Sequence, residues 1–303
     1  MKKLSIIAVL LLAFQMHGQQ DPQYTQYMYN MNIVNPAYAG SRENLSFGLL
    51  YRDQWSRIDG APETGTFFGH TPVGSNIGLG LSVISDKIGP VKETNAYVDV
   101  SYTLNLGGEH KLAFGVKAGA TFHDIDLSYN TVNVIDPTDP FFGMGISETT
   151  PNIGAGFFYY TNKYYVSLSV PNLLSSVHLD NGGLKIGSET QHYFLTGGYV
   201  FDLSPNTELK PSVMLKSAFD APTSFDVNLN ARFFKKFEIG ASYRLDDSFS
   251  GLVNFALTPG VRIGYAYDAI SSDIKAYAPA SHEIMLLFDL NFPKRVSRSP
   301  RYF

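Results

Sequence analysis

The chain has 303 residues, a formal net charge of −4 and a charged fraction of 17%, and it contains no cysteine. The lack of cysteine excludes a disulfide framework, a thiolate metal site and a lipid-anchored cysteine, and the absence of a basic stripe outside the C-terminal tail argues against nucleic acid as a partner. The chain carries 19 tyrosines and 22 phenylalanines but fewer charges than the roughly 25% of an average soluble domain, which indicates an environment other than plain water.

Residues 1–18 have the layout of a secretory signal peptide. Lys2 and Lys3 precede an apolar run from Leu4 to Phe14, and short polar residues follow. This run is too short to span a bilayer as a helix of the mature protein. We therefore expect an exported protein that is cleaved near Gly18.

The next segment, residues 19–43, belongs neither to the signal peptide nor to the strands that follow. Asp21 and Pro22 have the pattern of an N-cap and first helical turn, and one helical face then collects Tyr24, Tyr27, Met28 and Met31. The segment from Asp21 to Gly40 has no lysine or arginine. A short aromatic-faced helix is predicted, ending near Asn35.

Residues 44–292 alternate between apolar and polar side chains with a period of two, which is typical of β-strands. Phe225, Val227 and Leu229, for example, alternate with Asp226 and Asn228. The pattern predicts strands at 44–55, 63–70, 76–85, 94–105, 110–123, 151–160, 164–170, 190–202, 206–217, 223–232, 235–244, 248–257, 260–269 and 281–292. No linker or shift in composition divides this region, which we interpret as one all-β domain.

The connections between these strands favour a membrane barrel over a soluble sandwich. Every second connection is short and rich in turn residues, whereas Asp124–Thr150 and Pro171–Glu189 are long. Short turns on one rim, long loops on the other and an even number of about 14 strands are typical of a transmembrane antiparallel β-barrel. Aromatic residues near strand ends fit its interfacial girdles, and closure would remove the exposed edges of an open sheet.

The polar face of each strand should then point into the lumen. This face carries charges of both signs, at Arg52, Asp99, Lys117, Glu208, Lys210, Asp226, Arg232, Glu238, Arg244, Arg262, Asp268 and Glu283. Six glycines share the lumen-facing registers, namely Gly78, Gly80, Gly115, Gly119, Gly154 and Gly156. We predict that they leave room for a plug, a loop or a partner segment to approach the wall.

The two ends of the mature chain are the candidate interaction sites. The N-terminal segment is interpreted as a plug across the periplasmic mouth or as a partner-binding docking arm, with the candidate residues Tyr24, Tyr27, Tyr29, Asn35, Pro36 and Tyr38. Residues 293–303 form a basic periplasmic tail that contains Lys294, Arg295, Arg298 and Arg301. The tail suits an assembly signal, a docking site or a solvated end.

Two polar groups have residue types that suit a chemical site. His123 with Asp124 and Asp126 has the residue types of a catalytic triad, but an ordinary polar rim of the longest loop is the favoured interpretation. Asp136 and Asp139 offer oxygen ligands for calcium, although the prolines around them favour a plain turn. We expect no enzymatic activity, no metal and no cofactor.

The N-terminal stretch DPQYTQYMYNMNIVNPAYAG resembles the PorP/SprF family of type IX secretion system outer-membrane proteins. The resemblance extends in order through Arg52, Gln54 and Trp55, the turn DGAP at 59–62, the run YYTNKYYVSLSVPNLL at 159–174, and the ending RSPRYF. It implies a non-enzymatic barrel of the bacterial outer membrane that works with the secretion and gliding machinery. Its expected partners are outer-membrane lipid, the C-terminal signal domain of a secreted surface adhesin and other secretion components, which are periplasmic in some cases.

A transport channel of the fatty-acid type remains as an alternative, since about 14 strands and an N-terminal hatch are also expected there. Such a channel should contain a contiguous apolar pocket, whereas the lumen-facing registers of this chain are dominated by charges, glycine and small polar residues. An enzyme is the third interpretation.

Overall fold

The computed structural model describes residues 22–42, 44–128, 145–174, 180–181, 184–185, 191–218 and 221–290. In these ranges one antiparallel sheet closes on itself, because β10 pairs with both β7 and β12. Its strands are β1 (Leu45–Asp53), β2 (Glu63–Val73), β3 (Ile77–Ile88), β4 (Val91–Gly107), β5 (His110–Asp126), β6 (Gly145–Tyr160), β7 (Tyr164–Val170), β10 (His192–Tyr199), β11 (Phe201–Ser204), β12 (Thr207–Ala218), β13 (Ala221–Phe233), β14 (Phe237–Arg244), β15 (Ser248–Thr258), β16 (Val261–Ile270) and β17 (Ala280–Leu290).

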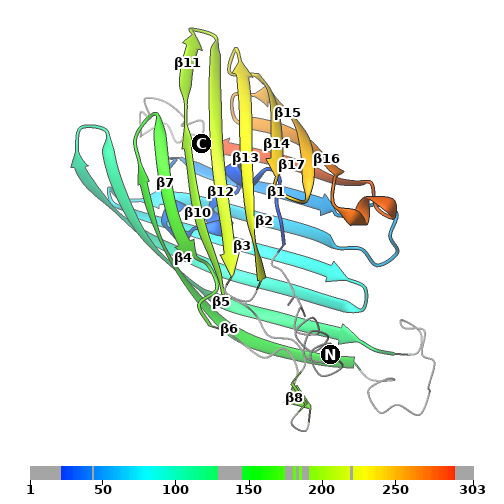
Figure 1. Cartoon of the computed structure of the whole chain (residues 1–303). Coiled ribbons are helices and arrows are strands. Elements are labelled where there is room, and N and C mark those ends of the chain that lie inside the picture. The colour runs from blue at the N-terminus through cyan, green and yellow to red at the C-terminus, as the bar shows by residue number, and fades with distance from the viewer. Residues whose placement is uncertain are drawn as a thin grey trace, which may run out of the picture.

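The strands β10 and β11 follow each other along the same edge of β12 and are interrupted at Val200, so they count as one wall segment. The wall therefore has fourteen segments, and the predicted 14-strand antiparallel barrel is confirmed. Figure 1 shows this wall. A separate ribbon of β8 (Asp180–Asn181) and β9 (Leu184–Lys185) was not predicted.

The two rims of the barrel differ as the sequence indicated. At the turn rim, the connections 74–76, 108–109, 161–163, 205–206, 234–236 and 259–260 are short, and β1 starts and β17 ends there. The other rim, called the loop rim, carries the longer connections 54–62, 127–144, 171–191 and 271–279, of which the last contains η3 (Asp273–Ala276). Since short turns face the periplasm in outer-membrane barrels, the loop rim is the extracellular one.

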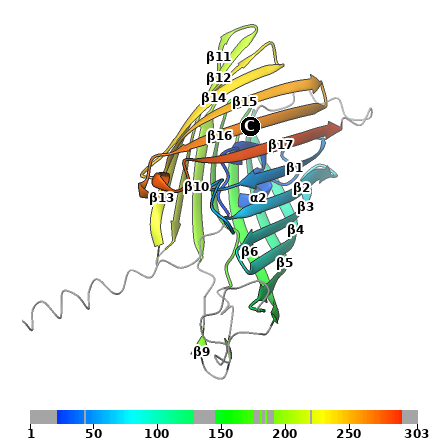
Figure 2. The ribbon, with the colours of Figure 1, turned by 90° about the vertical axis from the view of Figure 1, so that its right-hand side faces the viewer.

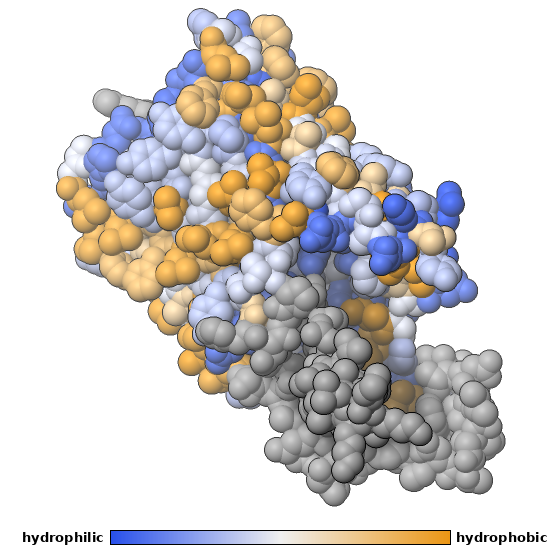
Figure 3. Space-filling model, viewed as in Figure 1, coloured by the Kyte–Doolittle hydropathy of each residue, from blue (hydrophilic) through white to orange (hydrophobic). Residues whose placement is uncertain are grey.

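Alternation places apolar side chains on the outer wall and polar ones inside. In β13, Phe225, Val227 and Leu229 are 38–49% exposed, whereas Asp226 and Asn228 are each 1% exposed. Figure 3 shows apolar residues spread over the outer surface of the wall. A soluble monomer rarely exposes contiguous apolar patches of this extent. The outer surface of the wall is therefore suited to contact with lipid. None of the helices within the described ranges is long and apolar enough to cross a bilayer.

Residues Pro22–Arg42, which we call the plug, lie inside the barrel (Figures 1 and 2). The plug contains three short turns in place of the predicted single helix: η1 (Tyr27–Tyr29), α2 (Met31–Val34) and η2 (Pro36–Tyr38). The prediction of a single helix with one aromatic face was wrong. The plug is enclosed on all sides, so its sequence has no polar stripe that would distinguish an exposed helix face from a buried one. Val34 ends α2, and Asn35 caps η2 by accepting a hydrogen bond from Ala37 N at 2.8 Å.

The plug was expected to lie across the periplasmic mouth. In the structure it runs along the lumen. Thr25 bonds to Asp268 and Glu283 near the loop-rim ends of β16 and β17. Gly40 bonds to His70 near the turn-rim end of β2. The chain therefore passes from the extracellular end of the lumen to the periplasmic end before it enters β1.

Candidate functional site

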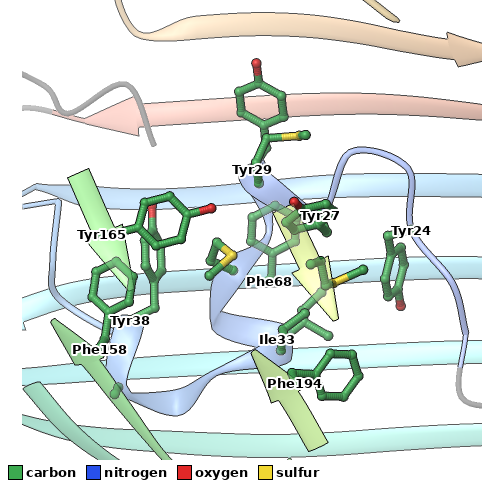
Figure 4. Packing of buried hydrophobic residues seen from close by; sticks show 14 of the residues in the cluster. Tyr24, Tyr27, Tyr29, Ile33, Tyr38, Phe68, Phe158, Tyr165 and Phe194 are labelled. Carbon is green, nitrogen blue, oxygen red and sulfur yellow. The ribbon is translucent and has the colours of Figure 1, made fainter. Parts of the chain in front are cut away.

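The plug and the lumen wall form one packed cluster. Tyr27, Met28, Met31 and Tyr38 are each at most 2% exposed, and they meet wall residues such as Phe158. Figure 4 shows Tyr27, Tyr38 and Phe158 among the buried side chains of this cluster. Burying an aromatic or methionine side chain contributes about 1.5–3 kcal/mol. The plug is therefore held first of all by apolar contact.

At the loop rim, three strands fix the start of the plug through charged groups. Arg52 of β1 lies 2.7 Å from Asp268 and 3.2 Å from Glu283. Glu283 accepts hydrogen bonds from the backbone N–H groups of Thr25 and Gln26 at 2.9 and 2.8 Å, and the Thr25 hydroxyl donates to Asp268 at 2.8 Å. The carboxylates thus receive donors from both the wall and the plug.

A second ion pair at this rim also reaches the plug. Arg244 of β14 donates to Asp226 of β13 at 2.8 Å. The same guanidinium donates to Gln23 Oε1 at 2.9 Å and to Tyr24 O at 3.3 Å. The loop-rim end of the plug is therefore bonded to two separate pairs on the wall.

The middle of the plug is bonded mainly through its backbone and amide groups. Lys117 of β5 lies 3.2 Å from Asp99 of β4 and donates to Asn32 O at 3.2 Å. Asn35 donates to Phe157 O at 2.8 Å and to the Ser167 hydroxyl at 2.6 Å. The lumen charges therefore have a structural role here, since they satisfy polar groups of the plug.

The glycine-lined side of the wall permits backbone contact. A Cβ built on Gly115 of β5 would overlap Ala37 N, and one built on Gly78 of β3 would overlap Ala39 O. At Gly156 of β6 it would overlap Asn35 Oδ1. The prediction that lumen glycines leave room for an inner segment is thus confirmed for these positions and for Gly80, which faces Ala39. Gly154 meets Pro171 of the 171–191 connection, which agrees with the predicted room for a loop, whereas Gly119 meets its neighbouring strand.

The turn-rim end of the plug faces charged residues on the opposite wall. The Tyr29 hydroxyl donates to Glu238 of β14, and Lys210 of β12 lies over the Tyr29 ring at 4.9 Å. Arg42 pairs with Asp289 of β17 at 3.1 Å. Burial raises the pKa of the Tyr29 phenol, and the nearby Glu238 carboxylate raises it further. The phenol therefore stays protonated and remains a donor.

The lumen beside the plug contains an outer and an inner cavity. The outer cavity, of about 60 Å³, lies at the loop-rim end between the plug residues Tyr24 and Ile33 and the wall residues Phe194 and Met214. The inner cavity, of about 480 Å³, opens at the turn rim between Tyr29 and the wall formed by β12–β17. The plug thus packs against the glycine-lined strands β3–β6 and leaves free space on the charged side.

The structure brings nearly all the predicted site residues to the plug or the inner cavity. Arg232 pairs with Glu208, and Arg262 lies 3.7 Å from Glu238, all near the turn rim. The basic tail, the signal peptide and the residues 136–140 lie outside the described residues. Partner binding by the plug residues stays a prediction.

Several contact residues were missed because no pattern in the sequence marks them. Thr25, Gln26 and Asn32 are small or medium polar residues within an aromatic stretch, and Arg42 lies two residues after the stretch Asp21–Gly40. Their partners lie 85 to 258 positions away in the chain. These contacts could have been identified only if the register of the paired strands had been known.

The polar group around His123 does not form a triad. The ring of His123 is buried and faces Glu93 at 3.5 Å. Asp124, the next residue of β5, points to the opposite, exposed face, where it accepts a hydrogen bond from Ser147 of β6. Among the described residues no cluster of three or more histidine, aspartate or glutamate side chains is arranged to hold a metal ion.

Comparison with known proteins places the chain in a family. Residues 16–288 match the family model described as type IX secretion system membrane protein PorP/SprF. No curated protein matches the sequence.

Solved barrels share the fold at low sequence identity. The CymD monoaromatic hydrocarbon channel is 14% identical, covers 86% of this chain and 93% of its own, and gives a TM-score of 0.53. The outer membrane protein Omp33 of Acinetobacter baumannii is 11% identical over 82% of this chain and 98% of its own, with a TM-score of 0.47. The toluene transporter TbuX of Ralstonia pickettii is 9% identical over 86% of this chain and 93% of its own, with a TM-score of 0.49. The likeness to CymD shows a common fold alone.

Proposed function

The chain belongs to the PorP/SprF family of type IX secretion system membrane proteins and is a β-barrel of the bacterial outer membrane, and from this we propose that it is a non-enzymatic component that binds a secreted surface protein. The partner is an adhesin, recognised through its C-terminal signal domain at the extracellular face. Binding there helps to export the adhesin or retain it at the surface and serves secretion and gliding.

The filled lumen is the observation that carries this proposal. A conduit for a polypeptide needs an open passage, whereas the plug is bonded at the loop rim through Thr25, in the middle through Asn35 and at the turn rim through Arg42. Its side chains are also buried against the wall. A barrel with a fixed plug suits a receptor for the exported protein better than its route of passage.

A gene deletion in the native host tests the proposal. We expect surface display of one or a few type IX partners to be lost, measured by protease treatment of intact cells, while the abundance of unrelated outer-membrane barrels stays normal. Display should return on complementation with the wild-type gene. Undiminished display of all type IX partners in the deletion strain would contradict the proposal.

Transport of small apolar molecules is the second candidate function, favoured by the apolar lining of the outer cavity. The hydrocarbon channel CymD has a similar fold. The outer cavity has about 60 Å³, however, whereas a cavity of about 150 Å³ binds benzene in another protein. Toluene uptake into vesicles containing the purified barrel separates the two functions, because a receptor with a fixed plug should give no uptake above that of empty vesicles.

A further inference from the structure

The inner cavity is much larger than the outer one, at about 480 Å³ against about 60 Å³. Its volume of about 480 Å³ falls within the roughly 300–1,000 Å³ of typical ligand pockets. Five cationic and two acidic side chains line it, although the whole chain has a net charge of −4. The charge around this opening is therefore opposite in sign to that of the protein.

Only part of the positive charge is neutralised within the cavity. Arg42 pairs with Asp289, and Arg232 pairs with Glu208. The remaining cations are Lys235 and Lys236, together with Arg262, whose ion pair with Glu238 is the longest of the three. The two lysines are exposed and have no ion-pair partner among the described residues, and the carboxylate nearest to Arg262 is that of Glu238 at 3.7 Å.

The turn that presents the two lysines has an unfavourable backbone. Both of its central residues, Phe234 and Lys235, have positive φ angles, 52° and 57°, in a turn closed by the bond from Lys236 N to Phe233 O at 3.0 Å. This left-handed conformation is unfavourable for residues that carry a side chain, and turns of this type prefer asparagine and glycine. Strained backbone of this kind is enriched at functional sites. Here it places Phe234, 69% exposed, beside the cationic cavity.

We propose that the inner cavity is a docking site for an acidic, extended peptide segment of a periplasmic protein. Carboxylates of the segment pair with Lys235, Lys236 and Arg262, and an apolar side chain packs against Phe234. The cavity opens at the turn rim, which faces the periplasm, so the segment reaches it without crossing the membrane. This inference does not rest on the proposed surface partner, which binds at the opposite rim.

The chain's own tail is a poor occupant of this cavity. The tail, residues 293–303, carries the cations Lys294, Arg295, Arg298 and Arg301. Cations repel cations, especially at low salt.

Peptide binding to the mature protein in detergent micelles tests the proposal. The probe is a fluorescein-labelled peptide with four glutamates around a Leu-Phe pair, and the comparison peptide has glutamine in place of each glutamate. Fluorescence anisotropy should show binding of the acidic peptide that weakens as salt rises, and binding of the glutamine peptide that is weaker by about tenfold or more. Equal binding of the two peptides would overturn the proposal.

Variants locate the binding site. The triple variant Lys235→Gln, Lys236→Gln and Arg262→Gln should weaken binding of the acidic peptide by about tenfold or more. The matched control is Lys163→Gln, which removes a cation at the same rim that pairs with Asp202 outside the cavity. It should bind as the wild type does. A triple variant with wild-type affinity would overturn the proposal.

Two further measurements guard against misfolding and against binding to the tail. A single cysteine at Thr258, inside the cavity, should crosslink to the peptide through a benzophenone maleimide, whereas a cysteine at Asn105, near the turn-rim end of β4, should not. A protein without residues 293–303 should still crosslink at Thr258. Loss of all peptide binding in this truncated protein would place the site in the tail and refute the cavity.

Discussion

One added methyl group at Gly115 of β5 should loosen the plug. A Cβ at this position would overlap Ala37 N and the carbonyl carbon of Pro36. Both are backbone atoms, so no side-chain rotation relieves the overlap, and Gly115→Ala forces the plug away from β5. Overpacking a dense interior costs about 1–3 kcal/mol, which corresponds to a fall of about 5- to 150-fold in the ratio of docked to undocked plug.

The lack of native cysteine makes this change measurable. Val34→Cys introduces a single thiol on the plug at a position that is 5% exposed. When docking is fast relative to labelling, the rate of maleimide modification reports the undocked fraction. We expect this rate to rise by the same factor when Gly115→Ala is added.

A matched glycine on another strand provides the control. A Cβ built on Gly251 of β15 meets nothing within 4 Å, so Gly251→Ala should leave the labelling rate of Val34→Cys unchanged. Equal rates with and without Gly115→Ala would refute the argument that β5 positions the plug. A rise of the same size from Gly251→Ala would refute its specificity.

Three further predictions follow from the path of the plug and from the wall. If cleavage occurs near residue 18, three residues precede Pro22 and span about 10 Å when extended. An epitope inserted before Gln19 should therefore bind antibody on intact cells. Binding only after permeabilisation of the outer membrane would contradict the direction assigned to the plug. Arg52→Gln removes the cation from two carboxylates that are at most 1% exposed and should lower the free energy of unfolding by about 3–5 kcal/mol. The loss is measured as a lower unfolding temperature in heat-modifiable gel mobility. Arg57→Gln on the exposed β1–β2 loop should have no effect. Val116 is 60% exposed on the outer wall, and Val116→Arg should cost about 2–4 kcal/mol if it faces lipid; barrel assembly equal to that of Asp59→Arg, an exposed loop variant, would contradict this placement.

The wall was readable from the sequence because each strand has two chemically different faces. The segment 164–170 was predicted with the bounds that β7 has, and Phe225 and Val227 were assigned to the face opposite Asp226. A barrel in lipid requires this sorting on every strand. The largest error was at β6, which begins at Gly145 and not at 151, because its first residues lie beyond the apolar belt and do not alternate clearly.

The contacts of the plug were not readable in this way. The structure places lumen charges such as Arg52 and Asp268 in the interior, but no local pattern pairs these two residues, which lie 216 positions apart in the chain. Such pairs depend on the strand register and on the closure of the sheet. The direction of the plug was equally hidden, since a segment buried on all sides has no amphipathic stripe and its glycine contacts lie on distant strands.

Locking the plug in place tests most directly whether this barrel acts as a receptor with a filled lumen. A Cβ built on Gly80 lies 3.3 Å from Ala39 Cβ, close to the roughly 3.5–4.5 Å of disulfides, so Ala39→Cys with Gly80→Cys should form the chain's single disulfide and fix the plug to β3. The measurement is surface display of the type IX partner on intact cells, with and without a reductant. We predict equal display in both states. Loss of display in the oxidised state, restored by reduction, would show that the plug must move and would contradict the account.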